Sequence, residues 1–167
     1  MRSETANLII VAHNLRSIYN AGSILRTCDG LGVEKFIATG TTPYPNASDT
    51  QLPHVVKRIN AQISKTALGA EESVDTSHGE IEEIINTLKH NDFKIYALEQ
   101  STESINLRNF VKPIDTKIAL IVGNENEGIA SDILQRADEI LEIPMVGTKE
   151  SFNVASATAI ALWQLTN

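Results

Sequence analysis

The chain has 167 residues, of which 42% are apolar and 21% are charged, values typical of a globular protein. This length is sufficient for one domain with its own hydrophobic core. The formal net charge of −7 excludes a protein whose whole surface attracts nucleic acid. An acidic chain has to confine any contact with RNA to a local patch, use a partner, or bind something else.

The cysteine content and the apolar segments indicate a cytoplasmic protein. Cys28 is the single cysteine, which excludes an intrachain disulfide and suits a reducing compartment. The first residues lack the apolar run of a signal peptide, and no stretch approaches the ~20 apolar residues of a membrane span. We therefore expect no membrane partner. The four histidines lack the spacing of a metal site, so we expect no metal.

Apolar runs alternate with helical patterns along the chain. In chain order, the sequence predicts a strand at 7–12, a helix at 20–31, a strand at 35–39, a loop at 40–46, one or two short helices at 54–68, a short strand at 73–76, a helix at 81–88, strands at 93–98 and 117–122, a short helix at 131–137 capped by Ser131, a strand at 140–143 and a helix at 153–165. This alternation predicts an α/β fold with an open, mostly parallel sheet flanked by helices.

The loop after Val122 is a candidate ligand site, because parallel sheets bind ligands outside the carboxyl ends of their strands. It runs from Gly123 to Gly128 and holds two glutamates between its glycines. It lacks the glycine spacing of a dinucleotide-binding loop and the lysine of a phosphate-binding loop. It suits a ligand with hydroxyl, amine or sulfonium groups, and an acidic surface turn would have the same composition.

Polar side chains also surround the first and last predicted helices. Ser151 and Asn153 precede the last helix, where they either cap its N-terminus or face a ligand. In the first helix, Arg26 follows two apolar residues, which fits a surface arginine with a buried stem or a functional guanidinium. Gly22 is small enough to allow close helix packing or the approach of a ligand.

Three of these stretches, in this order, resemble the SpoU (TrmH-like) family of SPOUT RNA 2′-O-ribose methyltransferases. They are Asn20-Ala-Gly-Ser-Ile-Leu-Arg-Thr-Cys-Asp-Gly-Leu-Gly32, Ile121-Val-Gly-Asn-Glu-Asn-Glu-Gly-Ile129 and Ile143-Pro-Met-Val-Gly-Thr-Lys-Glu-Ser-Phe-Asn-Val154. A weaker match lies at residues 65–71. The resemblance covers almost the whole chain.

The resemblance implies transfer of a methyl group from S-adenosyl-L-methionine to a ribose 2′-hydroxyl of tRNA or rRNA, without a metal. It implies an open α/β sheet with a C-terminal trefoil knot, and a homodimer in which the partner chain completes each site. It implies RNA rather than DNA as the partner, and a single SPOUT domain over 1–167 without the RNA-binding extensions of many relatives. A non-catalytic RNA-binding protein of the same fold is the alternative, and an unrelated nucleotide-binding α/β protein is a weaker one.

The resemblance also assigns site residues by position. It assigns the cofactor to Leu98, Gly123, Ile143, Met145, Ser151 and Phe152. It assigns catalysis to Arg26, with the site arranged by Asn20, Glu125, Ser151 and Asn153. Phe152 departs from the leucine that is usual there. Local basic candidates for RNA contact are Arg16, Lys57, Arg58, Lys65 and Lys149.

Arg26 suits the stabilisation of negative charge better than proton abstraction. A guanidinium offers several donors and does not release its proton in proteins. We therefore expect Arg26 to stabilise the developing charge on the ribose oxygen, or to hold the adjacent phosphate, rather than to act as a general base.

Overall fold

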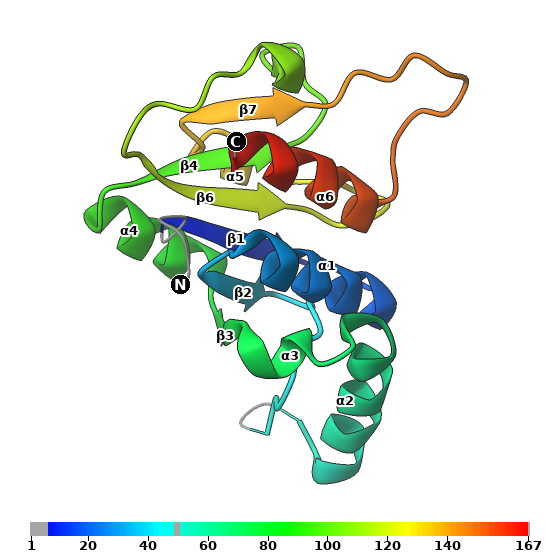
Figure 1. Cartoon of the computed structure of the whole chain (residues 1–167). Coiled ribbons are helices and arrows are strands. Elements are labelled where there is room, and N and C mark those ends of the chain that lie inside the picture. Colours follow the sequence, from blue (N-terminus) through cyan, green and yellow to red (C-terminus); the bar gives the residue numbers. More distant parts are fainter. Residues whose placement is uncertain (1–6, 49–50, 167) are drawn as a thin grey trace.

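The computed structural model describes residues 7–48 and 51–166, which form one sheet covered by helices (Figure 1). In chain order, the elements are β1 (Leu8–His13), α1 (Ile18–Leu31), β2 (Lys35–Thr39), α2 (Pro53–Ala67), α3 (Ala70–Ser73), β3 (Asp75–Gly79), α4 (Ile81–His90), β4 (Phe93–Leu98), β5 (Ile105–Asn106), the 3₁₀ helix η1 (Leu107–Asn109), β6 (Lys117–Val122), α5 (Ser131–Leu134), β7 (Glu139–Glu142) and α6 (Val154–Leu165). The strand order is β3-β2-β1-β6-β4-β7-β5, and each pair of neighbours is parallel. The parallel α/β fold predicted from the sequence is confirmed.

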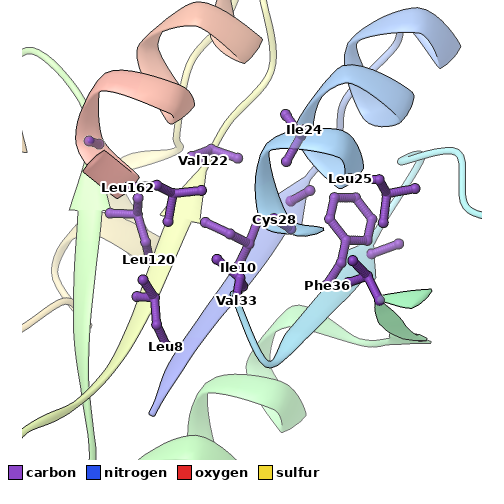
Figure 2. Packing of buried hydrophobic residues seen from close by; sticks show 14 of the residues in the cluster. Leu8, Ile10, Ile24, Leu25, Cys28, Val33, Phe36, Leu120, Val122 and Leu162 are labelled. Carbon is purple, nitrogen blue, oxygen red and sulfur yellow. The ribbon is translucent and has the colours of Figure 1, made fainter. Parts of the chain in front are cut away.

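The central strands are buried on both faces, so their side chains alternate between two cores. In β1, Leu8 and Ile10 pack in the core that contains side chains of α1, α2, α3 and α6. Ile9 and Val11 of the same strand pack in the second core, with side chains of α4. Figure 2 shows the first core, where side chains of α1 and α6 cover β1, β2 and β6. Burial on both faces explains why these strands are continuous apolar runs in the sequence.

Helices α1 and α2 approach each other closely at Gly22. A Cβ atom at this position would lie 2.7 Å from the carbonyl oxygen of Ile63 and would clash with the hydroxyl of Thr66. The Thr66 hydroxyl instead donates a hydrogen bond to the Tyr19 carbonyl oxygen at 3.0 Å. Gly22 therefore serves the packing of the two helices.

The direction in which the chain adds strands reverses between β1 and β6. From β1 the chain adds β2 and β3 on one side, and it builds β4, β5, β6 and β7 on the other, with β6 next to β1. Because all the strands are parallel, the carboxyl ends of β1, β6, β4 and β7 lie at the same edge of the sheet. Open α/β sheets bind ligands in the crevice at such a reversal.

Several predicted elements agree with the structure in type and position. The strands at 35–39, 93–98 and 117–122 have the predicted bounds. Asn153 caps α6, as predicted, whereas Ser151 lies outside the helix. Within the described residues, no helix is long and apolar enough to cross a membrane.

Other predicted bounds are wrong, mostly where elements are short or polar. Residues 70–73 form α3, and the next strand covers 75–79 rather than 73–76, because this polar edge strand has no apolar run to mark it. The segment expected as one or two short helices is one continuous helix, α2. Helix α5 ends at 134 and is preceded by Ala130, not Ser131, at its N-cap position. The two-residue strand β5 is too short to show periodicity and is missed altogether.

Candidate functional site

Glu125 connects the loop after β6 to the loop after β1. Its Oε2 accepts a hydrogen bond from the backbone N–H of Arg16 at 3.0 Å, and its Oε1 accepts one from the backbone N–H of Ser17 at 3.0 Å. The side-chain Nδ2 of Asn20 donates a third bond to Oε1 at 2.9 Å. One carboxylate therefore holds the start of α1, which Ser17 caps.

The neighbouring Asn124 fixes the same two loops through further hydrogen bonds. Its Nδ2 donates to the carbonyl oxygen of Asn14 at 2.9 Å. Its Oδ1 accepts bonds from the backbone N–H groups of Asn126 at 2.9 Å and Glu127 at 3.1 Å. Asn124 and Gly128 also pair through their backbones, which closes the loop. Side-chain-to-backbone bonds thus determine the shape of this loop.

Asn20 extends the hydrogen-bonded chain to α6. Its Oδ1 accepts a bond from Nδ2 of Asn153 at 3.1 Å. The Oδ1 of Asn153 in turn accepts bonds from the backbone N–H groups of Ala155 at 2.9 Å and Ser156 at 3.2 Å, which caps α6. Glu125, Asn20 and Asn153, three residues that the sequence singled out, therefore form one connected network at the starts of two helices.

The environment of Glu125 favours its charged form. Partial burial raises the pKa of a carboxyl group, but the hydrogen bonds from Arg16, Asn20 and Ser17 outweigh this effect, so the pKa of Glu125 lies below its ordinary value. Glu125 is therefore ionised at neutral pH and acts as an acceptor that organises the site.

A cavity of about 250 Å³ opens between the loops that follow β4, β6 and β7. Its walls include the apolar side chains of Leu98, Val122, Ile143 and Val154. Its described lining contains no lysine or arginine, and it contains four carboxylates, from Glu99, Glu125, Glu127 and Glu142. Apolar walls combined with carboxylates suit a ligand with an apolar ring and a cationic centre.

Gly123 allows the cavity loop to close on itself. A Cβ atom at Gly123 would lie 2.6 Å from the carbonyl carbon and oxygen of Gly128 and 2.6 Å from a side-chain carbon of Ile129. Any other residue at this position would push the end of the loop away from β6. The glycine expected for close approach of a ligand is thus required by the loop itself.

Most of the residues expected to hold a cofactor line this cavity. They are Leu98, Gly123, Ile143, Ser151 and Phe152. Met145 is outside the lining, farther along the loop between β7 and α6. Arg26 is exposed on α1 and also outside the lining, and within residues 7–48 and 51–166 no hydrogen bond or ion pair restrains its guanidinium. Within the described residues of a single chain, Arg26 therefore neither joins the network nor lines the cavity.

The basic candidates occupy three different places. Lys57, Arg58 and Lys65 are exposed on α2, and Lys149 is exposed in the loop between β7 and α6. Arg16 has an exposed side chain, and its backbone N–H is bonded to Glu125.

Glu99 and Gln100 are among the residues of the cavity wall that the sequence did not assign to the site. They follow β4 directly, at the edge where strands end and ligands bind, and this position was the available signal. Their types alone carry no signature, because glutamate and glutamine are common in surface loops.

The family model of the SpoU rRNA Methylase family matches residues 7–163 of this chain. The chain belongs to this family. The tRNA (guanosine(18)-2′-O)-methyltransferase of Aquifex aeolicus is 33% identical to it, over 95% of this chain and 68% of that protein. The 23S rRNA (guanosine-2′-O-)-methyltransferase RlmB of Haemophilus influenzae is 26% identical, over 95% of this chain and 58% of that protein.

Two solved structures share the fold. The AdoMet-bound rRNA methyltransferase from Sinorhizobium meliloti matches with a TM-score of 0.81 at 21% identity, over 95% of this chain and 55% of that one. The A. aeolicus TrmH/SpoU tRNA modifying enzyme matches with a TM-score of 0.78 at 26% identity, over 97% of this chain and 75% of that one. This SpoU chain therefore spans between 55% and 75% of the lengths of these two structures.

We expect Glu125→Gln to lower the free energy of unfolding by about 1–3 kcal/mol, because an amide has one acceptor oxygen for three donors. Folding lowers the pKa of Glu125. The charged carboxylate therefore stabilises the folded protein fully at pH values above its unfolded-state pKa of 4.5, and this stabilisation is lost as the pH falls through its folded-state pKa. Urea unfolding of the variant should therefore depend less on pH in this acidic range. Glu127→Gln, an exposed change in the same loop, is the control, and equal losses in both variants at neutral pH would contradict this role of Glu125.

Proposed function

We propose that this protein transfers a methyl group from S-adenosyl-L-methionine to a ribose 2′-hydroxyl of tRNA or rRNA. Its family and the names of its relatives, which act on tRNA and rRNA, support this activity. The observation that carries the proposal is the Glu125–Asn20–Asn153 network beside an acidic cavity with apolar walls. A non-catalytic RNA-binding protein would not require this combination.

S-adenosyl-L-methionine fits the chemistry of the cavity. The adenine ring suits the apolar walls formed by Leu98, Ile143 and Phe152, and backbone groups near Gly123 are available for its polar atoms. The positive sulfonium suits the surrounding carboxylates, whose field is strong where water is partly excluded. When bound, this cofactor supplies a methyl group that is already activated for transfer.

The residues of the chain bind, orient and stabilise the reactants. The network around Glu125 holds the starts of α1 and α6 beside the cavity, and correct alignment of two bound reactants is worth up to about 7–11 kcal/mol. Arg26, with its exposed guanidinium, stabilises the negative charge that develops on the ribose oxygen or holds the adjacent phosphate.

A second copy of the chain completes the site in this proposal. A groove of about 710 Å³ lies between α1, η1, α6 and the loop after β7, and Thr27, the neighbour of Arg26, lines it. Three large apolar side chains are exposed there, with accessible fractions of 43% for Phe152, 42% for Ile160 and 63% for Trp163. Ile143 and Phe152 line both the groove and the cofactor cavity, so a copy that covered the groove would reach the cavity as well.

Helix α2 is the local basic patch that an acidic RNA-binding protein requires. Its sequence contains no aspartate or glutamate. Lys57, Arg58 and Lys65 are exposed at positions that fall within about 100° of one another around a helix, together with His54. We assign RNA contact to this face, with Arg16 and Lys149 as contacts nearer the cavity. The trefoil knot implied by the family resemblance and the cytoplasmic location indicated by the sequence stay predictions.

The central experiment replaces Arg26. We expect Arg26→Lys to lower the rate of methyl transfer to RNA about 100-fold or more, because an ammonium cannot reproduce the planar fork of a guanidinium. Binding of S-adenosyl-L-methionine should be unchanged. The substrate is total RNA from cells that lack the protein, and the products are mapped as 2′-O-methyl sites. Arg136→Lys in the turn after α5, where the guanidinium binds Asn86, is the matched control. Normal turnover in Arg26→Lys would refute the assigned role.

RNA affinity should depend on salt through the basic face of α2. Each lysine or arginine that contacts a phosphate contributes about 0.7–0.9 to the slope of log affinity against log salt. We therefore expect Lys57→Ala, Arg58→Ala and Lys65→Ala each to reduce this slope by about that amount. Lys89→Ala on α4, across the sheet, should leave it unchanged, and identical slopes in all these variants would exclude α2 from the contact.

The proposed dimer can be tested at its groove. Sedimentation should give a dimer for the native chain and a monomer for Ile160→Glu, because a buried unpaired carboxylate opposes association. Ile114→Glu changes an apolar side chain that is 91% exposed in the loop before β6 and should leave the dimer intact. A native chain that is monomeric at micromolar concentration would contradict this assembly.

A further inference from the structure

Glu99, the first residue after β4, connects three segments around the cavity. Its Oε2 accepts a hydrogen bond from the backbone N–H of Ile129, just after the Gly123–Gly128 loop, at 2.9 Å. Its Oε1 accepts one from the backbone N–H of Gln100 at 2.9 Å, and its own N–H donates to the Leu141 carbonyl oxygen of β7 at 3.0 Å. One residue thus joins β4, β7 and the loop after β6.

The Glu99 carboxylate also lies directly against the backbone of the cavity loop. Gly128 has a φ angle of 67°, and a Cβ atom there would clash with Oε2 of Glu99. The loop backbone at Gly128 therefore approaches the Glu99 carboxylate more closely than a residue with a Cβ atom would allow. Because Ile129 is buried, water does not readily replace Glu99 as the acceptor for the Ile129 N–H.

Gln100 reaches the loop on the other side of the cavity. Its Nε2 donates a hydrogen bond to the backbone carbonyl oxygen of Glu150 at 2.8 Å. In the part of the chain that the structure describes, no other hydrogen bond holds residues 144–152. The same loop carries Ser151 and Phe152 of the cavity wall. One exposed glutamine side chain thus supplies the one described hydrogen bond to this wall.

We propose that Glu99 and Gln100 are positioning residues that together set the width of the cofactor cavity. Glu99 holds the Gly123–Gly128 loop against β4 and β7, and Gln100 holds the loop at 143–153 over the opening. The identity of the ligand rests on the function proposed above, whereas the two loop contacts do not. Loss of either side chain widens the cavity and weakens cofactor binding without altering the groups that act on RNA.

Weaker cofactor binding on loss of Glu99 would also follow from direct attraction between the Glu99 charge and a cationic ligand. Two substitutions distinguish this attraction from positioning. Glu99→Gln removes the charge and one of the two acceptor oxygens. Glu99→Asp keeps the charge but shortens the side chain by one methylene, so that it cannot reach both N–H groups. Positioning therefore predicts weaker binding in both variants, whereas attraction alone predicts near-normal binding in Glu99→Asp.

The experiment measures S-adenosyl-L-methionine binding by calorimetry, together with the kinetics of methyl transfer to total RNA. We expect the Kd and the KM for S-adenosyl-L-methionine to rise about tenfold in Glu99→Gln, Glu99→Asp and Gln100→Ala, the loss typical of one hydrogen bond. The kcat at saturating cofactor should stay within about twofold of the native value. Glu103→Gln and Thr102→Ala, exposed changes in the same loop, are matched controls.

Two further measurements need no cofactor. Hydrogen exchange of the Ile129 amide should be faster in Glu99→Gln and unchanged in Gln100→Ala. Trypsin cleavage after Lys149, next to the carbonyl that Gln100 binds, should be faster in Gln100→Ala and unchanged in Glu99→Gln. Near-normal affinity in Glu99→Asp, or native exchange and cleavage in the variants, would overturn the positioning role. A native chain that does not bind S-adenosyl-L-methionine would refute the proposed function, while exchange and cleavage would still decide whether the two side chains hold the loops.

Discussion

The Glu125 carboxylate is the contact on which the functional edge of this protein depends. It accepts hydrogen bonds from two backbone N–H groups at the start of α1 and from Asn20, and so joins the two strands at the centre of the sheet through their loops. Without an acceptor, these donors would lose hydrogen bonds in a partly buried position. The same charge that makes the loop acidic therefore keeps it in one conformation.

The fold places this contact where it can organise a ligand site. The strand order reverses between β1 and β6. The loops that follow these two strands therefore diverge toward helices on either side, and a crevice remains between the loops. β4 and β7 continue the edge beside β6, and their loops form the remaining walls of the cavity. Side-chain-to-backbone hydrogen bonds then fix irregular loops that strand pairing cannot reach.

Charge is divided over the molecule in a way that its net value conceals. Carboxylates line the cavity that is proposed to bind the cofactor, and α2 has only basic and neutral residues. Such a division reconciles the proposed contact of α2 with RNA with a net charge of −7 for the whole chain. The apolar groove between α1 and α6 is a third surface, continuous with the cavity through Ile143 and Phe152.

The sequence alone determined the features that local physics controls. Strands at 35–39, 93–98 and 117–122 were predictable because burial gives them continuous apolar runs, and the cap at Asn153 because its side chain satisfies nearby N–H groups. The three stretches that resemble the SpoU family also named Asn20, Glu125 and Asn153. Only the tertiary structure decided that these residues touch, since they are 105 and 133 positions apart and meet because parallel strands bring their carboxyl ends to one edge. The roles of Glu99 and Gln100 likewise depend on backbone groups of distant loops, and backbone groups leave no trace in a sequence.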